Sequence, residues 1–134
     1  ISGGLVGSEM CIRDSHLPSL IKAHRVQDKV ASIGFDFPNV KDTVDKIKEE
    51  FEEFNSALQS QNKSEIEEEF GDILFSLINY SRHIGIDSDE SLKKSIQKFI
   101  DRINKLEKVL KSKNLDFDNC SDEELNNFWN DVKK

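Results

Sequence analysis

The chain has 134 residues, with 26 acidic and 19 basic side chains and a formal net charge of −7. This length suits one domain with a modest core, and the negative charge argues against nucleic-acid binding, which needs clustered Lys and Arg. No apolar run approaches the ~18 residues that a membrane helix needs, and the two cysteines form no paired motif. We therefore expect a cytoplasmic protein in a reducing setting, with no nucleic-acid partner and no membrane span.

Residues 1–15 differ from the rest of the chain. They show no helical period and resemble a translated sequencing-adaptor sequence, so we expect a non-native or disordered segment. We leave this segment out of the fold prediction and expect residues 16–134 to form a single domain.

From Leu17 onward, apolar residues recur at steps of three and four, and no segment alternates with the period of a strand. Two capping boxes are predicted, Ser64 with Glu67 and Ser121 with Glu124. The expected helices run from about Pro18 to Gly34, Val40 to Leu58, Ser64 to Gly85, Ser88 to Lys111 and Ser121 to Val132. An all-α helical bundle is the expected fold.

Two acidic stretches, in the second and third expected helices, are near-copies of each other. Each carries two carboxylates three residues apart, Glu50 with Glu53 and Glu69 with Asp72. Residues at this spacing lie on one side of a helix. Because the loop between the helices is short, we expect antiparallel packing along an apolar seam, centred on Ile47, Phe51, Phe54 and Leu58 in one helix and on Ile66, Phe70, Ile73 and Leu77 in the other. The two pairs have the same offset from that seam and nearly the same distance from the turn, so they should project from one face.

Four carboxylates at one height repel one another and raise each other's pKa values, and a divalent cation removes that cost. Oxygen-only ligands favour Mg²⁺, or Mn²⁺, over Zn²⁺. Gly71, beside Asp72, weakens a helix by about 1 kcal/mol relative to Ala, which indicates the close approach of another helix or of a ligand. The alternative reading of the same acids is a solvated acidic face.

These acids also carry a family resemblance. The spacing Glu49-Glu50-x-x-Glu53, then Glu69-x-x-Asp72, resembles the MazG nucleoside triphosphate pyrophosphohydrolases, and the similarity extends from about Leu17 to the end of the chain. Further matching positions are Leu17-Pro18-x-Leu20, Lys22-Ala23, Gln27, Gly34-Phe35-Asp36, Asp45-Lys46, Gly71 to Phe75, Asn79, Arg82-His83, Lys98-Phe99 and Arg102. Related dUTP, dCTP and phosphoribosyl-ATP hydrolases share the acid runs and stay as alternatives.

The resemblance implies an all-α catalytic domain at residues 16–134, usually a homodimer that completes its core, binding Mg²⁺ and converting nucleoside triphosphates to monophosphate and pyrophosphate. It implies that the metal ligands are Glu50, Glu53, Glu69 and Asp72. It adds Glu49 as a further catalytic acid, which either binds a second ion or orients water. A nucleotide-pool-cleaning role follows from the same resemblance.

The resemblance also implies residues that bind substrate. Lys98 and Arg102 match positions implicated in triphosphate binding, and Trp129 matches one linked to the nucleotide. From the residues alone, a solvated basic patch is the better interpretation of the first two, and a core side chain is the better interpretation of Trp129; the resemblance makes core and nucleotide contact equally good interpretations of Trp129. Asn79 could reach a ligand or cap a carbonyl. Phe37 stands where many members have Trp, which we interpret as a change of anchor only. A helical nucleotide-binding or dimerisation module without hydrolysis is the competing class.

Overall fold

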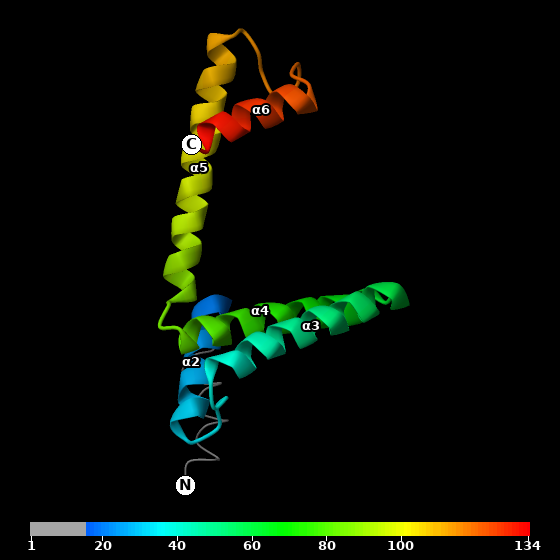
Figure 1. The fold of residues 1–134 in the computed structure, drawn as a ribbon, viewed down its shortest axis with the longest axis vertical. Coiled ribbons are helices and arrows are strands. Elements are labelled where there is room, and N and C mark those ends of the chain that lie inside the picture. The colour runs from blue at the N-terminus through cyan, green and yellow to red at the C-terminus, as the bar shows by residue number, and fades with distance from the viewer. Residues whose placement is uncertain (1–15) are drawn as a thin grey trace. The chain divides into compact units, whose positions relative to one another are not determined.

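The computed structural model describes residues 16–134, and the expectation for residues 1–15 lies outside the described residues. Over the described range the chain forms helices and no strand, as α2 (Ser19–Ser32), α3 (Val40–Ser60), α4 (Lys63–His83), α5 (Ser88–Ser112) and α6 (Asp122–Val132) (Figure 1). The predicted all-α fold is confirmed. None of these helices combines the length and the apolar character needed to cross a bilayer.

The chain divides after Asp89 into two compact units, which are described one at a time. The first contains α2, α3 and α4, with α4 packed against both of the others. The second contains α6 and nearly all of α5. The assignment of residues 16–134 to a single domain stays a prediction.

The two central helices of the first unit, α3 and α4, form a tight hairpin. Gln61 ends α3 in the left-handed conformation with φ 58°. Asn62 then begins α4, since its side chain accepts a hydrogen bond from the Glu65 N–H at 3.2 Å. The predicted capping box of Ser64 with Glu67 is therefore wrong, because the amide of Asn62 reaches the helix start first. So short a turn leaves α3 and α4 antiparallel and side by side (Figure 1).

The buried positions of this hairpin differ from the expected apolar seam. On α3 they are Thr43, Glu50 and Ala57, and on α4 they are Ile73, Ser76 and Ile78. Phe51 and Phe70, which the seam placed inside, are 48% and 51% exposed. The three buried α3 residues are seven apart, so they share one line along the helix. Small side chains and one carboxylate occupy that line, and part of the large apolar seam is left at the surface.

The third helix of this unit, α2, is joined to α4 by polar contacts. The buried Gln27 donates from Nε2 to the carbonyl of Phe75 at 3.0 Å. Gly34, at φ 101°, follows the end of α2, a conformation that side chains other than glycine rarely adopt. The connector, residues 33–39, then leads into α3, which Asn39 caps by accepting from the Asp42 N–H at 3.0 Å.

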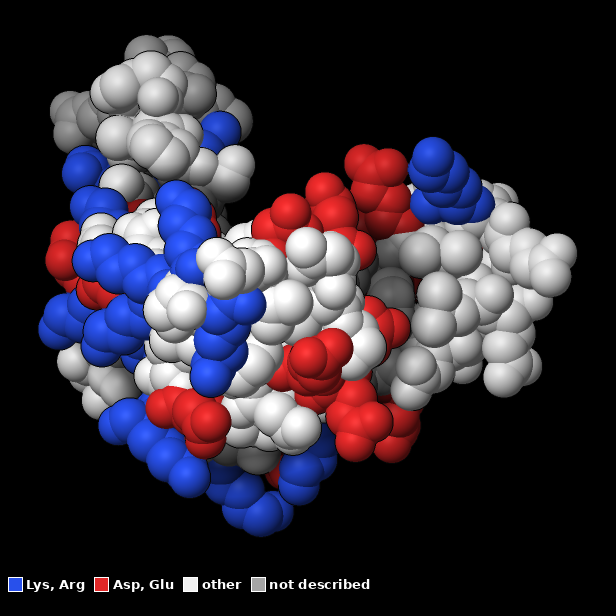
Figure 2. Space-filling model, turned by 90° about the horizontal axis from the view of Figure 1, so that it is seen from above, with Lys and Arg blue, Asp and Glu red and all other residues white. Residues whose placement is uncertain are grey.

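The second unit has its own small core. Leu106, Leu110 and Cys120 are buried at its centre, and partly buried apolar side chains of α6 and its preceding loop pack around them. The predicted capping box of Ser121 with Glu124 is confirmed, with both hydrogen bonds at 3.1 Å. Basic side chains are prominent on the molecular surface, gathering at the left and lower edges of the face seen in Figure 2.

Candidate functional site

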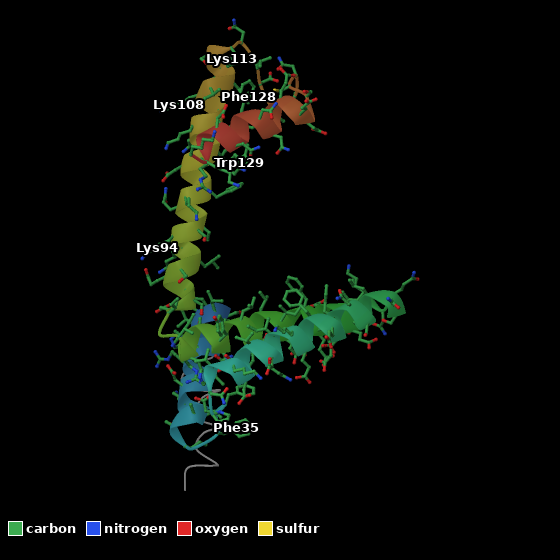
Figure 3. All side chains as sticks on the ribbon, viewed as in Figure 1. Phe35, Lys94, Lys108, Lys113, Phe128 and Trp129 are labelled. Atoms are coloured by element: carbon green, nitrogen blue, oxygen red, sulfur yellow. The ribbon has the colours of Figure 1, made fainter. Side chains whose placement is uncertain are left out.

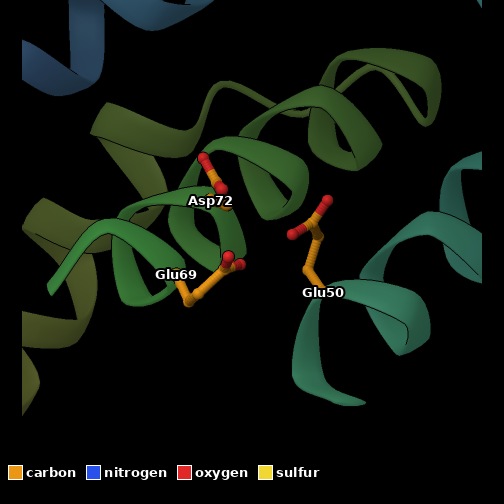
Figure 4. Close-up of side chains that lie close together, drawn as sticks. All are labelled: Glu50, Glu69 and Asp72. Atoms are coloured by element: carbon orange, nitrogen blue, oxygen red, sulfur yellow. The ribbon is translucent and has the colours of Figure 1, made fainter. Parts of the chain in front are cut away.

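The hairpin brings three of the predicted acids together. Glu50 comes from α3, and Glu69 and Asp72 come from α4. One carboxylate oxygen from each lies within 4.8 Å of the others, and the three side chains converge between the two helices (Figure 4). We call these residues the acid triplet. The prediction that acids of the two near-copied stretches meet on one face is therefore met for three of the four.

The fourth acid, Glu53, is exposed and lies outside the triplet, although it is electrostatically linked to it. The negative charge of Glu50 is the main cause that raises the pKa of Glu53, with smaller contributions from desolvation, a shared hydrogen bond and Glu69. The pKa of Glu69 is raised as well, first by burial and then by the charges of Asp72 and Glu50. Carboxylates here hold their charges against mutual repulsion, which is the condition expected of a cation site.

Lys46, which the sequence gave only as a position matching the family, partly balances this charge. Its Nζ lies 2.8 Å from Oε1 of Glu50 and 3.4 Å from Oε2 of Glu49. The hydrogen bond to Glu50 is the largest cause raising the pKa of Lys46. The spacing i, i+4 from Lys46 to Glu50 would have indicated the pair. Glu49 therefore lies on the exposed edge of the site, paired with Lys46.

Two buried oxygens of the triplet are suited to bind a metal ion. Oε2 of Glu50 and Oε2 of Glu69 are both buried and have no hydrogen-bond partner among residues 16–134. A buried carboxylate oxygen without a partner is costly, and a hard divalent cation takes oxygen ligands of this kind. The residues present therefore fit a hard divalent cation, through Glu50, Glu69 and Asp72.

Asn79 lies on α4 beyond the triplet and lines a cavity that also borders Glu50 and Asp72. Its Oδ1 accepts a hydrogen bond from Nη2 of Arg82 at 3.0 Å. Its amide oxygen is therefore occupied by Arg82, and capping of a carbonyl by its Nδ2 stays a prediction. Its role in substrate binding stays a prediction.

Three other predicted substrate residues belong to the second unit. Lys98 and Arg102 line one groove on α5, together with further lysines of that helix and of the chain end. Trp129 on α6 packs against the Leu106 and Leu110 core, and its ring centroid lies 5.6 Å from that of Phe99 on α5 (Figure 3). Trp129 is thus part of the core of its unit. Binding of substrate by these three residues stays a prediction.

Sequence reasoning missed an ion-pair network at the connector. Oδ1 of Asp36 lies 2.6 Å from Nη2 of Arg82 and 2.8 Å from Nε2 of His83. Arg82 and His83 lie in the last turn of α4, where basic side chains complement the helix dipole, and both also bind Asp36. Partial burial raises the pKa of Asp36, but the hydrogen bonds from Arg82 and His83 outweigh it and hold that pKa below its ordinary value. The separation of 46 residues between Asp36 and Arg82 gave no local pattern to detect.

The helical hairpin and its acid triplet define an all-α protein with a candidate divalent-cation site built from oxygen ligands. The profile of the MazG nucleotide pyrophosphohydrolase domain matches residues 39–106, about half of the chain, and this range contains the whole triplet. The chain belongs to the MazG family, as its resemblance predicted.

Individual relatives agree with this assignment. The chain is 34% identical over 117 residues to the nucleoside triphosphate pyrophosphohydrolase/pyrophosphatase MazG of Thermotoga maritima, covering 87% of this chain and 45% of that protein. It is 31% identical over 120 residues to the nucleoside triphosphate pyrophosphohydrolase of Escherichia coli K12, covering 88% and 46%. A third match, 35% identical over 76 residues, is the uncharacterized protein YabN of Bacillus subtilis, covering 57% and 16%. The chain spans about half the length of the first two relatives.

Proposed function

We propose that this protein hydrolyses nucleoside triphosphates to nucleoside monophosphate and pyrophosphate with a divalent cation, Mg²⁺ or Mn²⁺, held by the acid triplet. The observation that carries the proposal is the convergence of Glu50, Glu69 and Asp72 with two buried carboxylate oxygens that lack partners. Family membership and the activities for which the two relatives are named support the same reaction.

The chemistry begins with charge. A triphosphate carries about four negative charges and approaches three carboxylates only if cations intervene. A divalent cation supplies that neutralisation, polarises a phosphoryl group and lowers the pKa of a water molecule. Water is added across the anhydride between the α and β phosphorus atoms, so one fragment leaves as pyrophosphate and the other as the monophosphate.

The protein side chains have separate roles in this proposal. Glu50, Glu69 and Asp72 hold the cation, with Glu53 beside them as a fourth ligand. The exposed Glu49 orients water or holds a second ion. Lys46 balances the charge of Glu50 through its 2.8 Å contact. The amide of Asn79 contacts the nucleoside part of the substrate.

The second unit contributes the remaining substrate contacts in this proposal. Lys98 and Arg102 share one groove and grip the phosphate chain, and Trp129 contacts the nucleotide. Arg is well suited to this task because its planar fork binds phosphate oxygens in pairs.

We further propose that the protein works as a homodimer in the cytoplasm, where it removes unwanted nucleotides from the pool. Apolar side chains left on the surface support the dimer. Phe51 and Leu58 on α3 are about half exposed, as are Phe70, Leu74 and Leu77 on α4. Stripes of this size are unusual on a monomer and mark a contact surface. A second copy covering them would complete the core that the single chain leaves open.

The reaction is tested by incubating the purified protein with each common nucleoside triphosphate and Mg²⁺ and measuring pyrophosphate. Pyrophosphate and monophosphate should appear in equal amounts. Asp72→Asn should abolish the release while circular dichroism shows unchanged helicity. Release of orthophosphate alone would contradict the proposal. Nucleotide binding without any product would identify the non-catalytic module, and a preference for dUTP, dCTP or phosphoribosyl-ATP would assign the related activities.

A further inference from the structure

The connector between α2 and α3 forms one wall of a cavity of about 600 Å³ that reaches the acid triplet. Residues 35–38 line the cavity from the connector, and Glu50 and Asp72 border it from α3 and α4. The position of the connector therefore sets how wide the approach to these two acids is.

We propose that the connector is a gate on the path to the acid triplet, and that the carboxylate of Asp36 is the latch that holds this gate closed on α4. The inference rests on the proposed function, since it takes a nucleotide to be the molecule that passes. It concerns the rates at which the nucleotide enters and leaves, and it assigns no part of the nucleotide to the cavity.

Asp36 fastens the middle of the connector to the end of α4. Its Oδ1 accepts a hydrogen bond from Nη2 of Arg82 at 2.6 Å and lies 2.8 Å from Nε2 of His83. Hydrogen bonds of a charged carboxylate to an arginine are short and strong, and the lowered pKa of Asp36 agrees with a charged carboxylate here. The side chain of Asp36 is 28% exposed, so water can reach the latch and replace its partners.

The rest of the connector is held less firmly. Phe35 is 78% exposed, so its ring adds little apolar burial (Figure 3). The backbone N–H of Phe35 donates to the carbonyl of Val30 at 3.2 Å, at the long end of the usual range. Segments with little buried apolar surface and solvent-accessible hydrogen bonds open at a low free energy. The latch at Asp36 is therefore the contact on which the closed position mainly depends.

The two ends of the connector suit a hinge and a fixed point. Gly34 has φ 101°, a conformation that glycine leaves and enters with little strain. Hinges of moving loops are a few residues that absorb the backbone rotation. Pro38 has a fixed φ, and Asn39 beside it caps α3 by accepting from the Asp42 N–H at 3.0 Å. Rotation at Gly34 would thus move Phe35 to Phe37 and leave the start of α3 in place.

A gate of this kind changes rates and leaves affinity unchanged. If the closed connector blocks the path in the free and in the bound protein, a weaker latch multiplies the association and dissociation rate constants by the same factor. The dissociation constant is their ratio and stays the same. A variant that loses a contact to the nucleotide changes mainly the dissociation rate constant. The two cases are therefore separated by measuring both rate constants.

The passage of the nucleotide is tested by stopped-flow fluorescence with a methylanthraniloyl-labelled α,β-methylene analogue of ATP in the presence of Mn²⁺. Asp36→Ala should raise both rate constants at least fivefold and leave the dissociation constant within twofold of wild type. Gly34→Ala should have the same effect with the ion pairs intact, because alanine is strained at φ 101° while its Cβ would meet no atom within 4 Å in the described residues.

Asp28→Ala is the matched control, because Asp28 contacts the same guanidinium of Arg82 at 3.6 Å but belongs to α2. It should change neither rate constant. Four results would overturn the gate: unchanged rate constants in Asp36→Ala, a faster dissociation alone, equal acceleration in Asp28→Ala, or a wild type that does not bind the analogue.

The opening itself is tested without any ligand, by hydrogen exchange followed residue by residue with NMR. The reporter is the amide of Phe35, whose hydrogen bond to Val30 breaks when the backbone turns at Gly34 and is not itself deleted by Asp36→Ala. This amide should exchange at least fivefold faster in the variant, with unchanged exchange in the middle of α3 and α4. Equal acceleration throughout α3 and α4 would show a general loss of stability and contradict the latch. None of these measurements uses hydrolysis, so failure of the proposed reaction, seen as absent pyrophosphate release, is distinguishable from failure of the gate.

Discussion

Nζ of Lys46 lies 2.8 Å from Oε1 of the buried Glu50, while Oε2 of the same carboxylate has no partner among the residues that the structure describes. One oxygen of this carboxylate is therefore paired with a cation of the protein, and the other oxygen is available to a ligand. The different surroundings of the two oxygens lead to two of the expected outcomes below.

Replacing Lys46 should destabilise the metal-free protein. Lys46→Met removes the cation that balances Glu50, and a buried charged group left without its partner costs about 1–3 kcal/mol. Added Mg²⁺ should shrink this loss, because the cation supplies the missing charge. Urea denaturation with and without MgCl₂ measures both effects.

Lys41→Met is the matched control, because Lys41 pairs with Asp45 at 3.6 Å on an exposed surface. Surface pairs of this kind contribute about 0–1 kcal/mol. Equal losses for the two variants would contradict the special position of Lys46.

Removing one charge of the triplet should stabilise the protein in the absence of metal and make it less stable than wild type in the presence of metal. Glu69→Gln relieves the repulsion from Asp72 and Glu50, so the metal-free variant should be more stable than wild type at neutral pH. Mg²⁺ at 100 times its Kd should stabilise wild type by about 2.7 kcal/mol and should not stabilise the variant. Thermal melts across a Mg²⁺ series measure this. Glu67→Gln, an exposed neighbour outside the triplet, is the control; the same behaviour in both variants would argue against a cation at the triplet.

The Asp36 network predicts a dependence of stability on acid pH. The pKa of Asp36 in the folded state lies below the ordinary value of 3.8, so the folded state favours its charged form. The resulting stability is fully present above that ordinary value and is lost as pH falls through the lowered pKa. Asp36→Asn should therefore lower the free energy of unfolding by about 1–2 kcal/mol at pH 7. The difference between the variant and wild type should shrink as the pH falls below 3.8. Urea midpoints at several pH values provide the test, and a gap that does not depend on pH would count against it.

Replacing Gly71, beside Asp72, should affect the stability of the fold and the binding of a partner or substrate in opposite directions. A Cβ at Gly71 would meet no atom within 4 Å in the described residues, and Ala is the better helix former by about 1 kcal/mol. Gly71→Ala should thus raise the unfolding free energy by that amount. If a partner copy or substrate approaches this point, as the sequence indicated, the same variant should lose affinity for one of them. Denaturation, sedimentation and analogue binding measure these effects. A variant less stable than wild type would contradict the finding that a Cβ has room at position 71.

The helices were predictable from sequence because their periodicity and termini are local signals. Three of the four paired acids were placed correctly on one face, since Glu50, Glu69 and Asp72 meet. The seam prediction was less successful. It assumed that the largest apolar side chains fill the contact between α3 and α4, whereas Thr43 and Ala57 occupy buried positions. With Thr43 and Ala57 on the buried side of α3, Glu50 also faces inward and Glu53 lies outside the triplet.

Features that depend on long-range contacts were not predictable from local pattern. Asp36 and Arg82 meet only because α2 and the connector fold back on α4. The cavity has the same origin, since its walls come from elements separated by many residues. Phe37, interpreted from sequence as an anchor only, lines that cavity. A hydrophobic pattern does not distinguish apolar side chains that line a cavity from those that fill the core.

Anomalous diffraction at the manganese edge, from crystals soaked in Mn²⁺, shows directly whether the acid triplet binds a cation. We expect a peak within oxygen-coordination distance of Glu50, Glu69 and Asp72, which disappears in Asp72→Asn crystals. A peak at other side chains, or no peak at the triplet in a protein that still releases pyrophosphate, would contradict it.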